Sequence, residues 1–190
     1  MTIAEPTARR WSRDEYYRMA DLGWFQDQRV ELIEGEVVEM PPQKNLHAVA
    51  LKLVERALEA AFGPNFWVRV QSPLDLPDGS APEPDIAVVP GNPRDWKRHP
   101  QGALLVVEIS DSTLNFDRTR KARLYAGAGI SEYWVVNLVD SILEVYRNPV
   151  QQAALSAVLP YTDHQVYAAG QMISPLAVPE KEVAVADLLP

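Results

Sequence analysis

Three charged residues have the types and the placement that metal-assisted chemistry on a phosphodiester requires. Asp85 opens the apolar run that follows Pro82-Glu83-Pro84, and Glu108 lies late in the apolar run 104–109. Carboxylates in such runs are costly to bury unless they are paired or bound to a cation. Two carboxylates can hold Mg²⁺ or Mn²⁺, which polarises a phosphodiester and lowers the pKa of a bound water. Asp85 and Glu108 are therefore candidate metal ligands; a strand-end acid that faces water is the alternative for each.

Lys121 is the third member of this set. It lies in the segment 117–128, whose apolar spacing predicts a helix. The residues that share its face, at i+3, i+4 and i+7, are Leu124, Tyr125 and Ala128. A lysine on the face that packs against a sheet needs an anionic partner, which Asp85 and Glu108 would supply. Its ordinary pKa of about 10.4 favours an electrostatic role over a general base; a lysine that only covers apolar surface is the alternative.

The elements that must position these residues alternate between helix and strand. Ser12-Arg13-Asp14-Glu15 has the pattern of a capping box and opens a predicted helix over 13–22. Glu34-Gly35-Glu36 separates two apolar segments, 30–33 and 37–40, which predicts a hairpin. Further helices are predicted over 46–62 and 117–128, and strands over 66–70, 85–89, 104–109, 133–138 and 142–147. The fold class is therefore mixed α/β, with a central mixed sheet flanked by helices.

Length and composition limit the architecture. The 190 residues, 47% of them apolar, are expected to form a single domain over 1–190, in which about 150–190 is a Pro-rich, β-rich C-terminal extension. The chain has no cysteine, so disulfides, thiolate nucleophiles and cysteine-bound zinc are excluded. No apolar run reaches membrane-spanning length and the N-terminus lacks a signal-peptide pattern, so we expect no membrane association and a cytoplasmic location.

The charge distribution bears on nucleic-acid binding. A formal net charge of −8 argues against coating of nucleic acid without specificity. Basic residues nevertheless gather in three short stretches, at 9–13, 94–98 and 118–123, which could form a local basic surface or only solvated faces. Trp96 lies inside the second stretch, where it could stack on a base, although a tryptophan is more often a core residue.

Together the ordered motifs resemble a known family. The segments that carry the resemblance are Glu31-Leu-Ile-Glu-Gly-Glu36, Pro42 to His47, the Pro84-Asp85 strand, Val107-Glu-Ile-Ser-Asp-Ser-Thr113, Lys121-Ala-Arg-Leu-Tyr125 and Glu132-Tyr-Trp134. They resemble the Uma-type putative restriction endonuclease family of the PD-(D/E)xK nuclease superfamily, over residues 12–148. The resemblance implies a restriction-endonuclease-like fold, with an N-terminal helix and hairpin before the central sheet.

One departure from the superfamily pattern concerns the lysine. The E-x-K lysine would stand at position 110, which is Ser110, and the family's version moves it to the following helix, where Lys121 lies. The superfamily also uses an acid from its N-terminal elements. Glu31 is our candidate, because it interrupts an apolar strand, whereas Glu34 lies in the turn. His47 is a possible accessory residue, although a lone helix histidine is more often a capping or packing residue.

These expectations lead to one hypothesis with two rivals. The hypothesis is a Mg²⁺- or Mn²⁺-dependent DNA endonuclease in which Asp85 and Glu108 bind the metal, Lys121 stabilises transition-state charge and Glu31 is an auxiliary acid. The first rival is a non-catalytic oligomeric scaffold or DNA-binding module of the same fold, and the second is a phosphodiesterase that acts on a small substrate. A homo-oligomer is expected from the Pro-rich, apolar tail and from the need of duplex cutters for two active sites.

Overall fold

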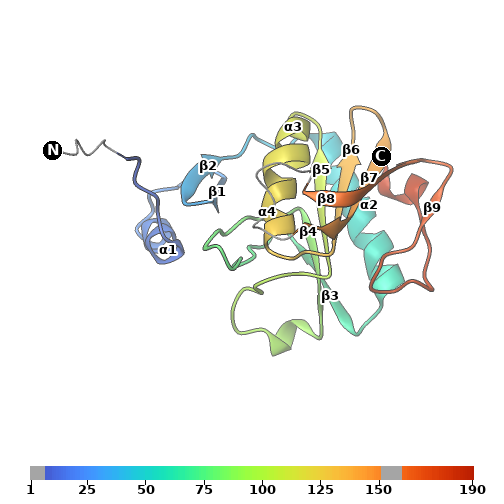
Figure 1. Cartoon of the computed structure of the whole chain (residues 1–190), viewed down its shortest axis with the longest axis horizontal. Helices are drawn as coiled ribbons and strands as arrows, with labels where there is room; N and C mark the ends of the chain where they lie inside the picture. Colours follow the sequence, from blue (N-terminus) through green and yellow to red (C-terminus); the bar gives the residue numbers. More distant parts are fainter. Residues whose placement is uncertain (1–6, 151–159) are drawn as a thin grey trace.

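A mixed six-stranded sheet forms the centre of the computed structural model, which describes residues 7–150 and 160–190 (Figure 1). Strands β5 and β6 pair in parallel, and every other neighbouring pair in this sheet is antiparallel. The strands, in their order across the sheet, are β3 (Phe66–Val70), β4 (Ile86–Pro90), β5 (Leu105–Ser110), β6 (Glu132–Asn137), β7 (Ile142–Pro149) and β8 (Tyr161–Ala168). This architecture confirms the predicted mixed α/β class.

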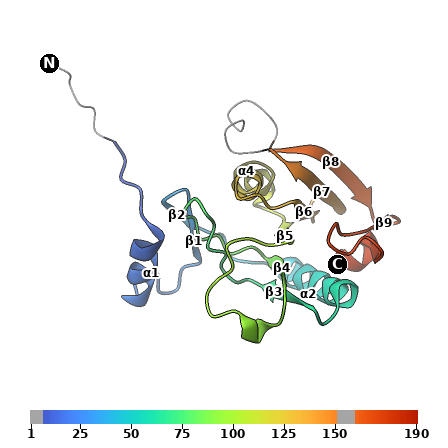
Figure 2. The same cartoon turned by 60° about the horizontal axis from the view of Figure 1, so that its bottom comes forward.

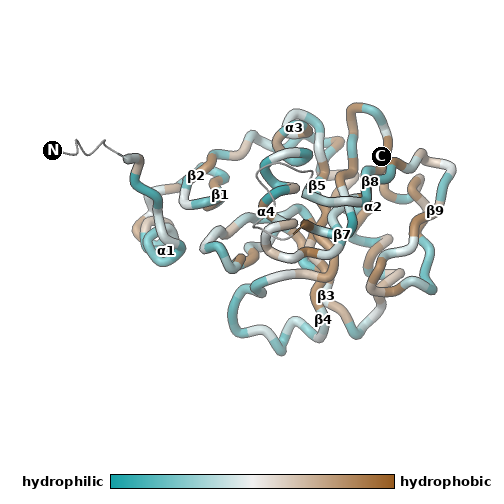
Figure 3. Tube along the Cα trace, viewed as in Figure 1, coloured by the Kyte–Doolittle hydropathy of each residue, from teal (hydrophilic) through white to brown (hydrophobic). Residues whose placement is uncertain are grey.

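Helices cover both faces of the sheet, as Figure 2 shows from the side. Helix α2 (Asn45–Phe62) packs on one face through Val54 and Leu58, which share an apolar cluster with alternate residues of the central strands. Helix α4 (Ala122–Gly127) packs on the opposite face with the intervening residues. Strands β4 and β5 are therefore apolar along nearly their whole length, which Figure 3 shows as brown segments at the centre.

The N-terminal elements lie beside the sheet (Figure 1). Helix α1 (Arg13–Asp21) begins with the predicted capping box, in which Ser12 and Glu15 bond each other's backbone N–H. Strands β1 (Val30–Ile33) and β2 (Glu36–Glu39) form a separate hairpin. The hairpin is joined to the rest of the protein by the Ala81 N–H, which donates to the Leu32 carbonyl at 2.8 Å. This contact holds β1 beside the edge of the sheet where β4 begins and β5 ends.

The helical segment after β5 starts earlier than the pattern 117–128 predicts and is not regular. It begins as α3 (Leu114–Phe116), widens into a π-helical turn over Asp117–Lys121 and continues as α4. The Asp117 carbonyl accepts hydrogen bonds from the Ala122 N–H and, at 3.1 Å, from the Tyr133 hydroxyl. A hydroxyl that bonds this carbonyl favours the wider turn. The turn leaves the side chains of Asp117 and Lys121 both buried.

The C-terminal extension contributes more structure than its weak pattern predicts. Strand β8 is an eight-residue edge strand, mostly exposed, which explains why its apolar signal is faint. Strands β9 (Met172–Ile173) and β10 (Val183–Ala184) and a 3₁₀ turn over Val185–Leu188 follow, and pack against α2. The segment is tied to β6 by Glu132, which is fully buried and accepts from Arg147 and from the Leu176 N–H. The part of the extension at 151–159 lies outside the described residues.

None of the helices in the described part of the chain is long and apolar enough to span a membrane.

Candidate active site

Strand register brings the two predicted metal ligands face to face. Ile86 pairs with Val107 across β4 and β5, so the next residues, Asp85 and Glu108, lie opposite each other. On the other side of β4, Val70 pairs with Ile86, which places Gln71 opposite Asp85. Like charges in opposite positions repel, so this row needs cations or hydrogen-bond donors to be stable.

Asp85 is held by donors on both of its oxygens. Its Oδ1 lies 3.0 Å from His47 Nε2 and 3.2 Å from Gln71 Nε2, and its Oδ2 accepts from the Ile109 N–H at 2.9 Å. Burial by itself would raise the pKa of Asp85. The hydrogen bond and charge of His47, followed by the Ile109 and Gln71 donors, outweigh burial and lower the pKa. The carboxylate is therefore ionised and fixed in orientation, as a metal ligand must be.

Glu108 is bonded to the helix that follows it in sequence. Its Oε1 accepts from Lys121 Nζ at 3.0 Å and from the Tyr125 hydroxyl at 2.6 Å, and its Oε2 accepts from the Asp85 N–H at 3.3 Å. Glu31, from β1, lies on the other side of the lysine. Its Oε2 is 2.6 Å from Lys121 Nζ, an ion pair whose angle falls outside hydrogen-bond geometry. One fully buried lysine thus links two acids from distant parts of the chain.

Burial and neighbouring charges set the pKa values of Glu108 and Lys121. Desolvation raises the pKa of Glu108 to about 8, although the charge of Lys121 acts in the opposite direction. Desolvation would lower the pKa of Lys121, but the carboxylates of Glu108, Glu31 and Asp117 outweigh it and raise the pKa. Lys121 is therefore protonated at neutral pH, which disfavours a general-base role.

The raised pKa of Glu108 predicts a pH-dependent metal affinity. A protonated carboxyl must lose its proton before it binds a cation, so Mn²⁺ affinity should rise roughly tenfold per pH unit between pH 6 and pH 8 and level off above. The stability of the fold changes with pH in the opposite direction. The folded protein holds the Glu108 proton more tightly than the unfolded chain does, so the free energy of unfolding of the metal-free protein falls as the pH rises from about 4.5 to about 8.

Calorimetric Mn²⁺ titrations at pH 6, 7 and 8, with urea unfolding at the same pH values, measure both effects. The Glu108→Gln variant is the matched control, because it cannot titrate and its stability should lose this pH dependence. An Mn²⁺ affinity that is constant between pH 6 and pH 8 would contradict the assignment.

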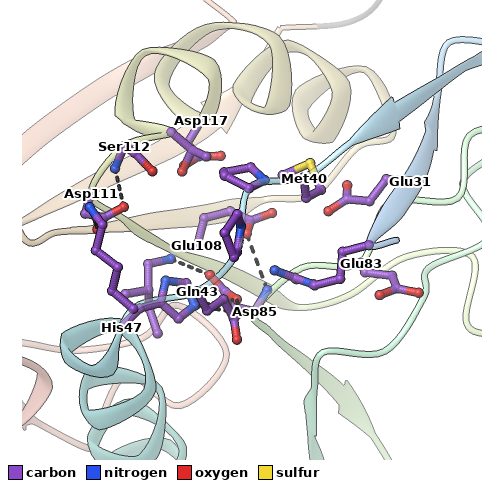
Figure 4. Close-up of a pocket in the computed structure, with 16 residues that line it drawn as sticks. Glu31, Met40, Gln43, His47, Glu83, Asp85, Glu108, Asp111, Ser112 and Asp117 are labelled. Atoms are coloured by element: carbon purple, nitrogen blue, oxygen red, sulfur yellow. Dashed lines mark hydrogen bonds and ion pairs between the residues drawn. The ribbon is translucent and has the colours of Figure 1, made fainter. Parts of the chain in front are cut away.

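A cavity opens in front of the two carboxylates, and Figure 4 shows the side chains around it. Its volume is about 30 Å³, room for one or two water-sized groups. Besides Asp85 and Glu108, it is lined by Glu31, Gln43, His47, Glu83, Asp111 and Asp117, among others. Lys121 does not line the cavity but lies behind Glu108. Its charge can therefore act on a bound group only from behind the carboxylates.

The donor set fits a hard divalent cation. Within residues 7–150 and 160–190, no group of three or more His, Cys, Asp or Glu side chains is arranged to hold a metal. Mg²⁺ needs no such cage, because it is commonly bound by one or two carboxylates, and waters and substrate phosphates complete its shell. Asp85 and Glu108 match this pattern, and Mn²⁺ accepts the same oxygen ligands.

The structure brings all five sequence-predicted residues together: Asp85, Glu108, Lys121, Glu31 and His47. For His47, where capping or packing is the more common role, the structure shows a contact between its ring and Asp85. Glu34, expected to be exposed, pairs with Arg120 at the surface.

Sequence reasoning missed the side chains that support this site. Gln43 and Gln71 contact Asp85, and Asp117 accepts from the Ser110 and Thr113 hydroxyls. Only strand register reveals Gln71. Tyr125 had a signal, since it lies four residues after Lys121 on the same helix face, but that spacing equally fits a packing residue.

Comparisons with known proteins give the family and the fold of this chain. No curated protein matches the chain. Among solved structures, the fold is similar to the crystal structure of "a putative nuclease belonging to DUF820" from Anabaena variabilis ATCC 29413, with a TM-score of 0.68 and 15% sequence identity over 93% of this chain and 96% of that chain. The family model Uma2, described as "Putative restriction endonuclease", matches residues 13–186. This chain belongs to the Uma2 family.

Proposed function

We propose that this protein is a Mg²⁺- or Mn²⁺-dependent DNA endonuclease, with Asp85 and Glu108 as metal ligands, Lys121 as the electrostatic group and Glu31 as the auxiliary acid. Membership of a family described as "Putative restriction endonuclease" supports a nuclease, and the description of the similar Anabaena variabilis protein as "a putative nuclease" supports the same class. The assignment of individual residues rests on the geometry of the site.

One observation carries the proposal: two buried carboxylates from neighbouring strands, Asp85 and Glu108, lie opposite each other beside a cavity, and Glu108 is bonded to a fully buried lysine. Buried ion pairs of this kind often cost stability relative to apolar residues, so their presence favours a functional role. Perturbed carboxyl pKa values beside a cavity are also typical of functional sites.

Each residue then has a role in phosphodiester hydrolysis. A divalent ion held by Asp85 and Glu108 would polarise the phosphodiester and lower the pKa of an attacking water. His47 and Gln71 keep Asp85 ionised and oriented. Lys121, held protonated by Glu31 and Glu108, provides positive charge behind the carboxylates, where a low dielectric strengthens its attraction for the negative charge on the reacting phosphate.

The proposal is tested on the wild-type protein. Calorimetry should show that Mn²⁺ binds at pH 8. A supercoiled plasmid should be nicked or cleaved in the presence of Mn²⁺ and should stay intact when EDTA replaces the metal. A chromogenic phosphodiester serves as a parallel substrate. DNA binding without cleavage would select the DNA-binding module, and cleavage of the chromogenic diester alone would select the small-substrate phosphodiesterase. Absence of Mn²⁺ binding would favour the scaffold.

A homo-oligomer is part of this proposal, because a duplex cutter needs two active sites. Gel filtration that gives the monomer mass of 21.3 kDa would count against it.

A further inference from the structure

A second groove lies over β3 and the loop after β4, away from the carboxylates. Its volume is about 480 Å³, within the range of about 300–1,000 Å³ that small-molecule sites occupy. Four basic side chains and two indole rings line it: Arg69, Lys97, Arg98, His99, Trp67 and Trp96. This composition favours an anionic ligand that carries a flat ring.

Arg69 is the least satisfied residue of this groove. Its side chain lines the groove, yet the residue is only 3% exposed. Among the residues that the structure describes, its Nε and Nη1 atoms have no hydrogen-bond partner, and its Nη2 only reaches His99 Nδ1 at 3.4 Å. A buried guanidinium without a carboxylate is destabilising. Its planar fork of N–H donors matches a phosphate. Because Nε and Nη1 are themselves buried, the guanidinium would have to turn toward the groove for a phosphate to pair with them.

The one acid of the groove is already engaged. Asp75 Oδ1 accepts from the Tyr17 hydroxyl at 2.8 Å and lies 3.7 Å from Arg13 Nε. Among the described residues it forms no ion pair with Arg69, and its charge only partly offsets the effect of burial, which lowers the pKa of Arg69. His99 is positioned by stacking on Tyr17, with ring centroids 6.1 Å apart.

The two tryptophans are placed by different means. Trp67 precedes Arg69 by two residues, so both project from the same face of β3, and the guanidinium carbon lies 4.8 Å from the indole centroid. Trp96 follows the 3₁₀ turn Pro93–Asp95, and its Nε1 donates to the Pro90 carbonyl at 3.2 Å. Lys97 and Arg98, which come next, are exposed. Indole rings beside cations are typical of sites that bind unpaired nucleotides, because a base stacks on the ring.

The groove is connected to the carboxylate site through β3. Arg69 pairs with Ala87, and Gln71, two residues on, donates to Asp85. Arg69 and Gln71 therefore project from the same face, roughly 7 Å apart along the strand. The groove and the carboxylates therefore lie on the same face of the sheet, at neighbouring positions along β3.

We propose that this groove is a subsite for an unpaired nucleotide of a DNA strand, with the phosphate on Arg69 and the base against Trp96 or Trp67. The inference rests on the proposed function, which it deepens: the substrate would contain a single-stranded segment, such as a flap or a frayed end. Lys97 and Arg98 would contact the neighbouring phosphates, so binding would weaken as salt rises.

Binding is measured in EDTA, where no cleavage occurs, by titrating the full chain with short oligothymidine and following tryptophan fluorescence. We expect quenching, and an affinity that falls with salt. Arg69→Met should weaken binding about tenfold or more without lowering the melting temperature, because it removes an unpaired buried charge. Trp96→Ala, in an exposed loop, should weaken binding roughly fivefold or more. Lys52→Met, which removes an exposed cation from α2, is the matched control and should change nothing.

The outcomes separate the subsite from the proposed function. Absence of quenching in the wild type, or wild-type affinity in both Arg69→Met and Trp96→Ala, would overturn the subsite. A blunt hairpin duplex that binds as tightly as oligothymidine would overturn the assignment to an unpaired nucleotide. If oligothymidine binds as expected but Mn²⁺ supports no cleavage of plasmid, flap or single strand, the proposed function fails and the subsite stands.

Discussion

Asp85→Ala should abolish both Mn²⁺ binding and DNA cleavage, with a loss of cleavage rate on the order of 10³-fold or more. The carboxylate lies opposite Glu108 in the strand row, and a metal held by the remaining acid alone would lose half of its protein ligands. Calorimetry with Mn²⁺ and plasmid cleavage at pH 8, where Glu108 is substantially ionised, measure the two effects.

Folding has to be separated from chemistry in this experiment. Alanine leaves the Ile109 N–H and the His47 and Gln71 donors without an acceptor, which costs about 1–3 kcal/mol of stability. Asp85→Asn keeps an acceptor and nearly the same shape, and should lose metal binding with less effect on unfolding by urea. Glu144→Gln is the matched control, because Glu144 is a buried acid of β7 that pairs with Arg118 outside the cavity. Cleavage at the wild-type rate by Asp85→Ala would sink the active-site assignment.

Lys121→Met should slow cleavage by roughly 10²- to 10³-fold, the usual loss when one preorganised electrostatic group is removed from an active site. The substitution keeps an unbranched apolar side chain and removes the terminal ammonium group with its charge and donors. Because the substitution removes the buried cation that both Glu31 and Glu108 contact, the protein should also lose about 3–5 kcal/mol of stability. Single-turnover cleavage with saturating Mn²⁺ and urea unfolding report the two losses separately.

A second substitution distinguishes the electrostatic role from a merely structural one. Lys121→Met combined with Glu31→Gln removes both members of a buried ion pair instead of one, so it should recover part of the stability but none of the cleavage rate. Arg120→Met is the neighbouring control, since Arg120 pairs with Glu34 and Glu36 at the surface of the hairpin. If the double variant recovered wild-type cleavage, Lys121 would be a structural residue and the catalytic assignment would be wrong.

The local elements of this protein could be predicted because their signals lie within a few residues of one another. The capping box at Ser12, the glycine turn at Gly35 and the helical spacing of 46–62 correspond closely to α1, the β1–β2 hairpin and α2. The costly burial of Asp85 and Glu108, each in an apolar run, pointed to a site before any contact was known. Local sequence alone was less informative for β8, because an exposed edge strand depends on pairing with β7 and not on its own apolar content.

Local sequence patterns are therefore enough to predict the kinds of element, the two acids and the helix face that carries Lys121. Which of these residues meet depends on the tertiary fold. Register across β3, β4 and β5 put Gln71 and Glu108 on either side of Asp85, and chain folding brought Glu31 to the far side of Lys121. Such contacts depend on strand pairing and packing between residues distant in sequence. The local hydrophobic periodicity of the sequence does not predict these contacts. It does not predict the unpaired donors of Arg69 either, because they follow from the positions of the neighbouring side chains that the structure describes.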